Sequence, residues 1–142
     1  MPIYKKNASV KNGMPYLQKG INNSEKNQIK LDQMVLDLNK LPNIKVKAAI
    51  VALQKGDSKG WFALCAEDAV LYDDGNQVQF NNFFKKAIGH ERFTTIDKVE
   101  NNGLDVYGDF HSDQWGNFKT CFKFQINKAG KISRLDIGQA SY

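Results

Sequence analysis

A change in hydrophobic periodicity near Arg92 constrains the fold of this chain more than any other feature of its sequence. Before Arg92, apolar residues recur every three or four positions, which is typical of amphipathic helices. After it, apolar and polar residues alternate, which is typical of strands with one buried face. The alternation is clearest over 118–127, where one face would carry Phe118, Thr120, Phe122, Phe124 and Ile126. A helical half followed by strands covered on one side predicts an α+β fold around a curved antiparallel sheet.

Turn and capping residues divide this pattern into four helices and six strands. The helices are expected from the Asn22-Asn23-Ser24 cap to Leu41, across 46–53 with Gly56 as the end cap, at 58–65, and from Asn81 or Asn82 to Gly89. The strands are expected at 69–73, 77–80, 92–100, 104–111, 118–127 and 131–139. The Asp74-Gly75-Asn76 segment predicts a tight hairpin turn, because these residue types tolerate positive φ. Irregular spacing of the apolar residues in the last strand suggests a bulge.

The bulk composition is that of one self-sufficient globular domain. The chain has 142 residues, of which 42% are hydrophobic, so its core needs neither a disulfide nor a metal. Cys65 and Cys121 are too far apart for a metal-binding pair and are expected to be reduced thiols. The sequence contains no membrane-length apolar run and no secretory signal in its first ten residues, so a cytoplasmic location is expected.

The net charge of +5 does not point to nucleic acid. Residues 1–47 carry nine lysines and three acidic residues, whereas 48–142 carry eleven basic and twelve acidic residues. The basic excess therefore lies in the N-terminal segment and not on the folded body, where a nucleic-acid-binding surface is expected. Nucleic acid is therefore not expected as a partner. The alternative, binding through the basic segment, would show a steep loss of affinity with salt.

Three segments resemble the nuclear transport factor two-like superfamily, which includes ketosteroid isomerases and SnoaL-like polyketide cyclases. They are AIVALQKGD at 49–57, FALCAEDAVLYDD at 62–74 and INKAGKISRLDIG at 126–138. The resemblance divides the chain into a 44–142 domain and a 1–43 extension, a flexible arm with one amphipathic helix. It implies a cone-shaped curved antiparallel sheet covered by helices, a cystatin-like roll. It also implies a pocket for a small apolar molecule, no cofactor, and a possible homodimer.

The same resemblance implies where catalytic groups would lie. The isomerases' catalytic base falls on Asp73, but their two oxyanion-stabilising donors fall on Ala49 and Phe122, which donate no hydrogen bond. Loss of one such donor typically lowers the rate by about 10²–10³-fold. A steroid-type isomerase using that mechanism is therefore not expected.

Asp73 remains the first candidate for a catalytic base, with Asp136 and His90 as helpers. A carboxylate at a pocket mouth can act as a general base when a neighbouring acid raises its pKa. The alternative is that Asp73 only opens the Asp-Gly turn. The candidate pocket residues are aromatic and would equally suit a plain core: Trp61, Phe62, Tyr72, Phe84, Phe93, Phe122 and Phe124. Two histidines with scattered acidic residues predict no metal site.

Two functions fit these residues. One is a small-molecule pocket with isomerase- or cyclase-like acid–base chemistry, and the other is a non-catalytic ligand-binding or protein-interaction module of the same fold. A buried carboxyl beside an open cavity would favour chemistry. A cone filled by Phe122 and its neighbours would favour the module. A third side-chain group, Tyr107, Asp109 and His111, is expected on the outer face of its strand.

Overall fold

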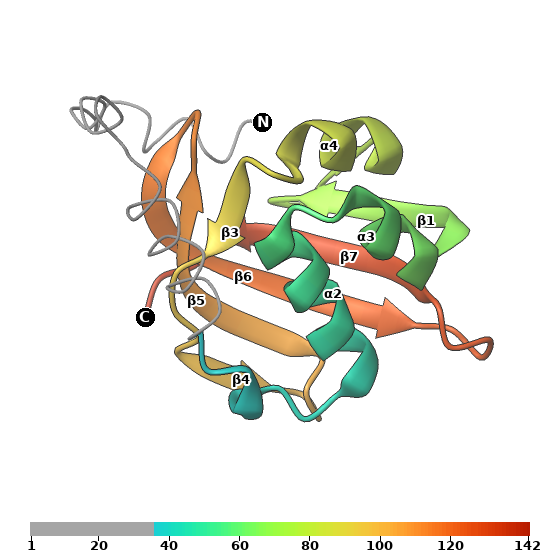
Figure 1. The fold of residues 1–142 in the computed structure, drawn as a ribbon, viewed down its shortest axis with the longest axis horizontal. Coiled ribbons are helices and arrows are strands. Elements are labelled where there is room, and N and C mark those ends of the chain that lie inside the picture. The colour runs from blue at the N-terminus through green and yellow to red at the C-terminus, as the bar shows by residue number, and fades with distance from the viewer. Residues whose placement is uncertain (1–35) are drawn as a thin grey trace, which may run out of the picture.

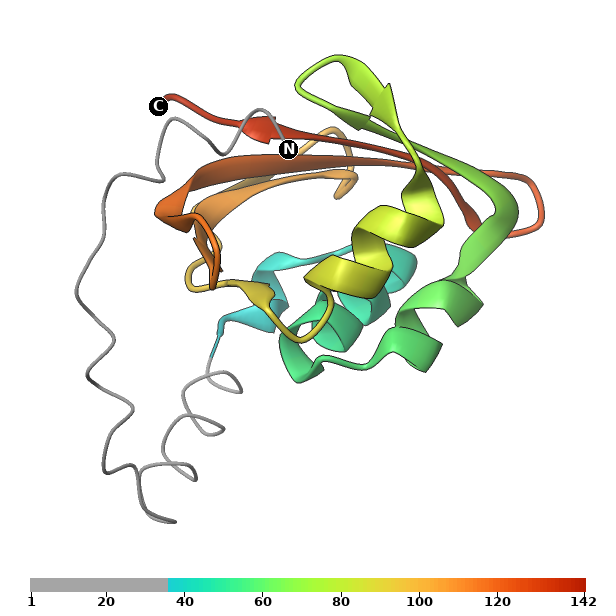
Figure 2. The same cartoon turned by 90° about the horizontal axis from the view of Figure 1, so that it is seen from above.

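The computed structural model describes residues 36–142 as three helices and a short 3-10 turn packed against one curled, unclosed seven-stranded sheet (Figure 1). All three helices lie on the concave side of the sheet (Figure 2). The expected α+β roll is confirmed. The predicted helix that ends at Leu41 falls mainly outside the described residues, and Leu38–Lys40 (η3) form a 3-10 turn. The division into 1–43 and 44–142 stays a prediction.

The helices begin and end where capping residues occur. Asn43 caps α2 (Ile44–Lys55) by accepting hydrogen bonds from the two backbone N–H groups of Lys45 and Val46, and Gly56 ends it with a φ of 70°. Asp57 caps α3 (Ser58–Leu64). The last helix, α4 (Phe80–Ala87), begins one residue before Asn81, and Gln79 precedes it without a side-chain cap. No helix within 36–142 is long and apolar enough to cross a membrane.

The sheet has the strand order β2-β1-β7-β6-β5-β3, with β4 also paired to β5. Its strands are β1 (Cys65–Asp73), β2 (Asn76–Val78), β3 (Glu91–Phe93), β4 (Lys98–Glu100), β5 (Asp105–Ser112), β6 (Gly116–Ile126) and β7 (Ile132–Gln139). All pairs are antiparallel except β1 and β7, which run parallel. The alternation of side chains is the same in both arrangements, so the local pattern does not reveal this pairing.

The single strand predicted for 92–100 is wrong, because the chain breaks into β3 and β4. The segment between them crosses β5 closely. A Cβ atom on Gly108 would lie 2.0 Å from the carbonyl oxygen of Thr95, so only glycine allows the approach. The Thr95 hydroxyl accepts a hydrogen bond from the backbone N–H of Asp109. On the N-terminal side of this segment, β3 pairs with the end of β5, and its first residue, Glu91, lies opposite Ser112.

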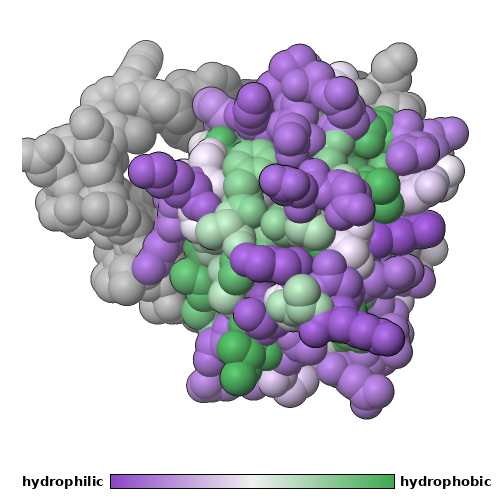
Figure 3. All heavy atoms as spheres, turned by 90° about the vertical axis from the view of Figure 1, so that its right-hand side faces the viewer, coloured by the Kyte–Doolittle hydropathy of each residue, from purple (hydrophilic) through white to green (hydrophobic). Residues whose placement is uncertain are grey.

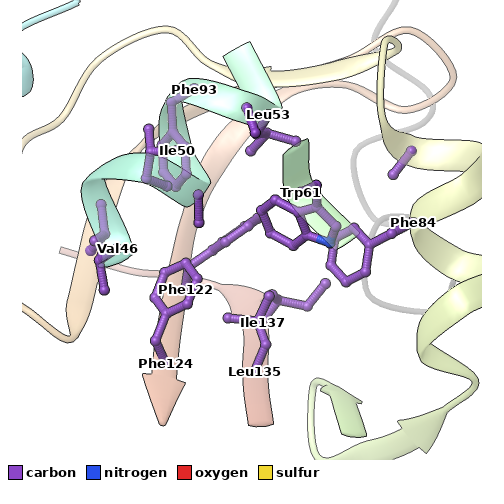
Figure 4. Close-up of a cluster of buried hydrophobic side chains, with 14 of the residues drawn as sticks. Val46, Ile50, Leu53, Trp61, Phe84, Phe93, Phe122, Phe124, Leu135 and Ile137 are labelled. Atoms are coloured by element: carbon purple, nitrogen blue, oxygen red, sulfur yellow. The ribbon is translucent and has the colours of Figure 1, made fainter. Parts of the chain in front are cut away.

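Large aromatic side chains fill the deep part of the cone (Figure 4). The ring centroid of Phe93 lies 5.1 Å from that of Phe110 and 5.0 Å from that of Phe122. On the helical side, Trp61 packs against Phe84 at 4.6 Å. Polar side chains surround a smaller apolar area on the face seen in Figure 3. The predicted bulge is present as well, since Gln125 pairs with Arg134 and Ile126 with Ile132, leaving Ser133 as the extra residue.

Candidate functional site

Asp73 is the most deeply buried acidic side chain in the described residues, with no exposed surface. It ends β1, and side chains alternate along this strand, so Asp73 shares the inner face with Leu71. In the parallel register, Leu71 lies opposite Leu135 and Asp73 lies opposite Ile137, both core residues of β7. The carboxyl group therefore points into the apolar interior of the curved sheet.

Neither carboxylate oxygen of Asp73 has a hydrogen-bond partner among the described residues. The hairpin turn is formed by Asp74 and Gly75, which have φ values of 54° and 86°. Burial raises the pKa of Asp73 to about 6, and the neighbouring Asp74 carboxylate adds to the increase. An isolated buried carboxylate is costly, so burial shifts the titration of this group from its ordinary acidic range towards neutral pH.

Glu91 is a second inward acidic residue, at the start of β3. Its side chain is half-buried and faces the same side as Phe93, two residues along the strand. The Ser112 hydroxyl donates a hydrogen bond of 3.0 Å to Oε2 of Glu91 and accepts one of 3.1 Å from the Trp115 backbone N–H. The pKa of Glu91 is raised to about 7, chiefly by burial and to a smaller extent by the carboxylates of Asp73 and Asp113, while the Ser112 hydrogen bond and His90 act in the opposite direction.

Sequence reasoning missed Glu91, although a signal was present. Glu91 and Phe93 are two positions apart, so a buried Phe93 places Glu91 on the inner face of any strand that contains both. The 92–100 strand boundary excluded Glu91 from that strand.

A cavity of 410 Å³ lies between α4, β3 and the loop that joins β5 to β6. We call it the α4 cavity, and it is lined by Phe83, Lys86, Ala87, His90, Glu91, Ser112, Asp113, Gln114 and Trp115. Asp73 is not part of this lining. Glu91 is the acidic side chain of this lining whose pKa is raised by the charge of the buried Asp73.

His90 lies on the exposed rim of the α4 cavity. Its Nδ1 atom is 3.2 Å from Oδ2 of Asp113, and the other carboxylate oxygen of Asp113 is 2.8 Å from Nε2 of His111. Nδ1 of His111 is in turn 2.7 Å from the Asn117 side-chain oxygen. Asp113 thus lies between two histidines at the rim, which fixes the loop that closes one side of the cavity. The expected outward positions of Tyr107, Asp109 and His111 are confirmed by their alternation with buried residues in β5.

The structure does not bring Asp136 to Asp73. Asp136 lies opposite Tyr72, and both project from the outer face of the sheet. There, Nε and Nη2 of Arg134 donate hydrogen bonds of 2.6 and 2.9 Å to the two carboxylate oxygens of Asp136. The guanidinium carbon of Arg134 lies 4.0 Å from the centre of the Tyr72 ring. A hollow of 490 Å³ on this face includes Asp136, Tyr107 and Tyr142.

The aromatic residues expected in the pocket occupy other positions. Five are fully buried core residues, at most 2% exposed: Trp61, Phe84, Phe93, Phe122 and Phe124. Phe62 packs at the edge of this core and Tyr72 lies on the outer face. The lining of the α4 cavity includes none of the seven and has Phe83 and Trp115 instead. Large rings pack best against one another, and this packing fills the deep cone.

Three further features of the described residues bear on chemistry. The indole Nε1–H of Trp61 is buried and has no hydrogen-bond partner among the described residues. Within 36–142, no three side chains of the His, Cys, Asp and Glu types are grouped so that they could hold a metal ion. Cys65 and Cys121 are free thiols. Asp73 and Glu91 are the acidic residues of the described region whose pKa values are raised.

Comparison with known proteins identifies the fold. No family model matches the sequence, and no curated protein matches it. Solved structures match with TM-scores slightly above 0.5. An NTF2-like protein of unknown function from Cytophaga hutchinsonii superposes with a TM-score of 0.56 at 14% identity, covering 68% of this chain and 87% of that one. A protein provisionally assigned as a polyketide cyclase from Sinorhizobium meliloti gives 0.56 at 20% identity, covering 67% and 94%.

A third match is the orange carotenoid protein of Anabaena with bound canthaxanthin. It gives a TM-score of 0.56 at 18% identity and covers 70% of this chain but only 36% of the carotenoid protein. Matches at these identities establish the architecture alone. Residues 36–142 therefore have the nuclear transport factor two-like fold, as the sequence resemblance implied.

Proposed function

We propose that this protein binds a small, largely apolar molecule in the α4 cavity and exchanges a proton with it through the carboxyl groups of Glu91 and Asp73. The observation that carries the proposal is the Asp73 side chain, which is fully buried with both oxygens unpartnered within the described region. A buried polar group without a partner costs on the order of 1–3 kcal/mol, and a charged one costs more. An apolar side chain at this position would serve stability better.

The titration range of the two carboxyl groups supports proton transfer. A general base works best when its pKa lies near the working pH, and the pKa values of Asp73 and Glu91 are raised to about 6 and about 7. Perturbed groups of this kind cluster at functional sites. Glu91 would contact the ligand, and Asp73 would hold or release a proton behind it. This is the chemistry required of an isomerase- or cyclase-like enzyme.

Proteins of the same fold agree with a small apolar ligand. One neighbour carries a polyketide cyclase assignment and another binds the carotenoid canthaxanthin. Phe83, Ala87 and Trp115 give the α4 cavity of this chain an apolar part, beside which Glu91 and Ser112 supply a few polar groups. Small-molecule sites commonly combine these two kinds of lining. A homodimer and a cytoplasmic location remain predictions.

A non-catalytic binding module is the second candidate. The rings of Phe93, Phe110 and Phe122 fill the deep part of the cone. A ligand would therefore have room only at the open end of the cone. The positions at which the isomerases have their oxyanion donors are Ala49 and Phe122, both buried and apolar. This module would use the α4 cavity to bind a ligand but would leave the protons of that ligand unchanged.

The test is a ligand screen on the wild type, on Asp73→Asn and on the exposed control Asp68→Asn. Ring compounds and polyketide-like acids are tested by thermal shift, where a ligand at a hundred times its Kd adds about 2.7 kcal/mol to the free energy of unfolding. Each hit is then incubated in D₂O, and proton exchange is followed by NMR. Exchange that is lost in Asp73→Asn but kept in Asp68→Asn supports catalysis. Binding without exchange supports the module, and absence of any hit argues against both.

A further inference from the structure

We propose that the α4 cavity selects ligands in which a positively charged amine adjoins a flat apolar body, and that Glu91 is the carboxylate that holds the amine. This inference rests on the proposed function, because it concerns the same cavity. It adds the charge of the ligand, which neither the fold nor the resemblance specifies.

The two inward carboxyl groups have no cationic partner within residues 36–142. The described ion pairs involve other acidic residues, and neither Asp73 nor Glu91 takes part in one. Lys86 from α4 lines the α4 cavity, but its side chain is exposed and forms no ion pair with Glu91. His90 at the rim lowers the pKa of Glu91 but forms its ion pair with Asp113. Glu91 is therefore free of an ion pair within the described residues, and a cation is the natural complement of an ionised carboxylate.

Glu91 is held as a ligand-binding carboxylate would be. The Ser112 hydroxyl donates a hydrogen bond to Oε2 of Glu91. Ser112 is 1% exposed, and its hydroxyl also accepts a hydrogen bond from the Trp115 backbone N–H. Oε1 of Glu91 has no hydrogen bond among those of the described residues, so it is available to an ammonium group in the α4 cavity. Hydrogen bonds between an ammonium and a carboxylate are among the stronger ones that proteins form.

The apolar part of the lining suits the same ligand. Phe83 and Trp115 line the α4 cavity beside Glu91. Aromatic rings bury flat apolar surface, and their faces attract cations, tryptophan most strongly. An aromatic or alicyclic amine would therefore place its ring against Phe83 and Trp115 and its charge at Glu91.

The groups that surround Glu91 predict a dependence on pH. They are Asp73 on β1, Lys86 on α4, the neighbouring His90, and Ser112 and Asp113 at the end of β5. Asp113 is already engaged by the two histidines at the rim. Glu91 titrates at about pH 7, and a bound ammonium stabilises its ionised form. Amine binding should therefore release protons below this pH and should weaken as the pH falls, whereas a neutral ligand has no such dependence.

The experiment compares three probes with the same ring: benzylamine, benzyl alcohol and benzoate. Binding to the full chain is measured by NMR titration at pH 8 and at pH 5. We expect benzylamine to bind at least about tenfold more tightly than either of the others at pH 8 and to lose most of this advantage at pH 5. Glu91→Gln keeps the size of the side chain and an acceptor for Ser112, and should lower benzylamine affinity by about tenfold. The exposed control Glu67→Gln should leave it unchanged.

The first two outcomes overturn this inference but leave the proposed pocket intact, and the third overturns both. If benzyl alcohol or benzoate binds the α4 cavity as tightly as benzylamine, the cavity is a ligand site but the preference for a cation is wrong. If benzylamine binds equally well to the wild type and Glu91→Gln, the assigned carboxylate is wrong. If none of the three probes shifts resonances of the cavity residues, both this inference and the proposed pocket lose their support.

Discussion

The side-chain amide of Gln54 pairs with both backbone groups of Phe93: Nε2 donates to the carbonyl oxygen and Oε1 accepts from the N–H, each at 2.8 Å. These two buried hydrogen bonds connect α2 to β3, the short strand that begins with Glu91. The helix α2 thereby holds β3 in place, and with it Glu91, which is two residues from Phe93.

Replacement of Gln54 should therefore affect stability and the site together. Gln54→Ala removes both hydrogen bonds and leaves buried backbone groups of Phe93 unpaired. We expect a loss of about 2–4 kcal/mol in the free energy of unfolding, measured by urea denaturation. Gln77→Ala, at an exposed position of β2, is the control and should change it by less than about 0.5 kcal/mol. Equal effects in the two variants would contradict a role for the Gln54–Phe93 pair.

Replacement of Asp73 by an apolar residue should make the protein more stable. Asp73→Leu replaces the unpartnered carboxyl by an apolar side chain facing Ile137. We expect the free energy of unfolding at pH 7 to rise by about 1–3 kcal/mol, while ligand binding or turnover is lost. Differential scanning calorimetry measures the first effect. A less stable Asp73→Leu protein would show that the carboxyl has a structural partner and would remove the main support for the proposed function.

Stability should fall as the pH rises from about 4 to about 6. The pKa of Asp73 in the folded protein is about 6, above its ordinary value of 3.8, so the folded state binds more protons than the unfolded state in this range. Raising the pH therefore favours unfolding, by about 2–3 kcal/mol for Asp73 over the full interval. Urea denaturation of the wild type and Asp73→Asn at several pH values isolates this contribution, because Asn does not titrate. If the free energy of unfolding changes with pH in the same way in both proteins, the pKa of Asp73 is not raised.

Gly108 should not tolerate a side chain. Gly108→Ala would place a methyl group 2.0 Å from the Thr95 carbonyl oxygen, and the clash involves backbone, which yields with difficulty. We expect a loss of about 1–3 kcal/mol or more in the free energy of unfolding. The segment that crosses β5 should also separate from it. Faster amide hydrogen exchange at Asp97 and Asp109, whose N–H groups bond across this crossing, would report that separation. Unchanged exchange rates would mean that the segment accommodates the methyl group without separating from β5.

The sequence pattern predicted the elements that depend on local periodicity and turn chemistry. The spacing of Val46, Ala49, Ile50 and Leu53 identified α2, and the alternation from Phe118 to Ile126 identified β6. The Asp74-Gly75 turn also formed as expected. In each case the residues that decide the conformation are within a few positions of one another, so the sequence displays the cause directly.

The features that the sequence did not reveal depend on contacts between distant residues. The close approach of Thr95 to Gly108 splits the 92–100 strand, and nothing local to that strand indicates it. Asp73 and Asp136 are both acidic residues of strands with mixed patterns. Only the register of β1 against β7 shows that the first lies inside the sheet and the second outside. The size of the cavity depends on how the phenylalanines pack, which composition alone does not determine.

The parallel pairing of β1 with β7 has a consequence for folding kinetics. Leu71 and Leu135 are adjacent in space but 64 positions apart in the chain, so their contact closes a long loop. Contacts of this kind slow folding, and during synthesis β1 has to wait for β7 to leave the ribosome before the two strands can join. The nascent chain would meanwhile expose the inner face of β1 to chaperones. The carboxyl of Asp73 would then acquire its apolar surroundings only when β7 joins β1, so the proposed site could not form before that pairing.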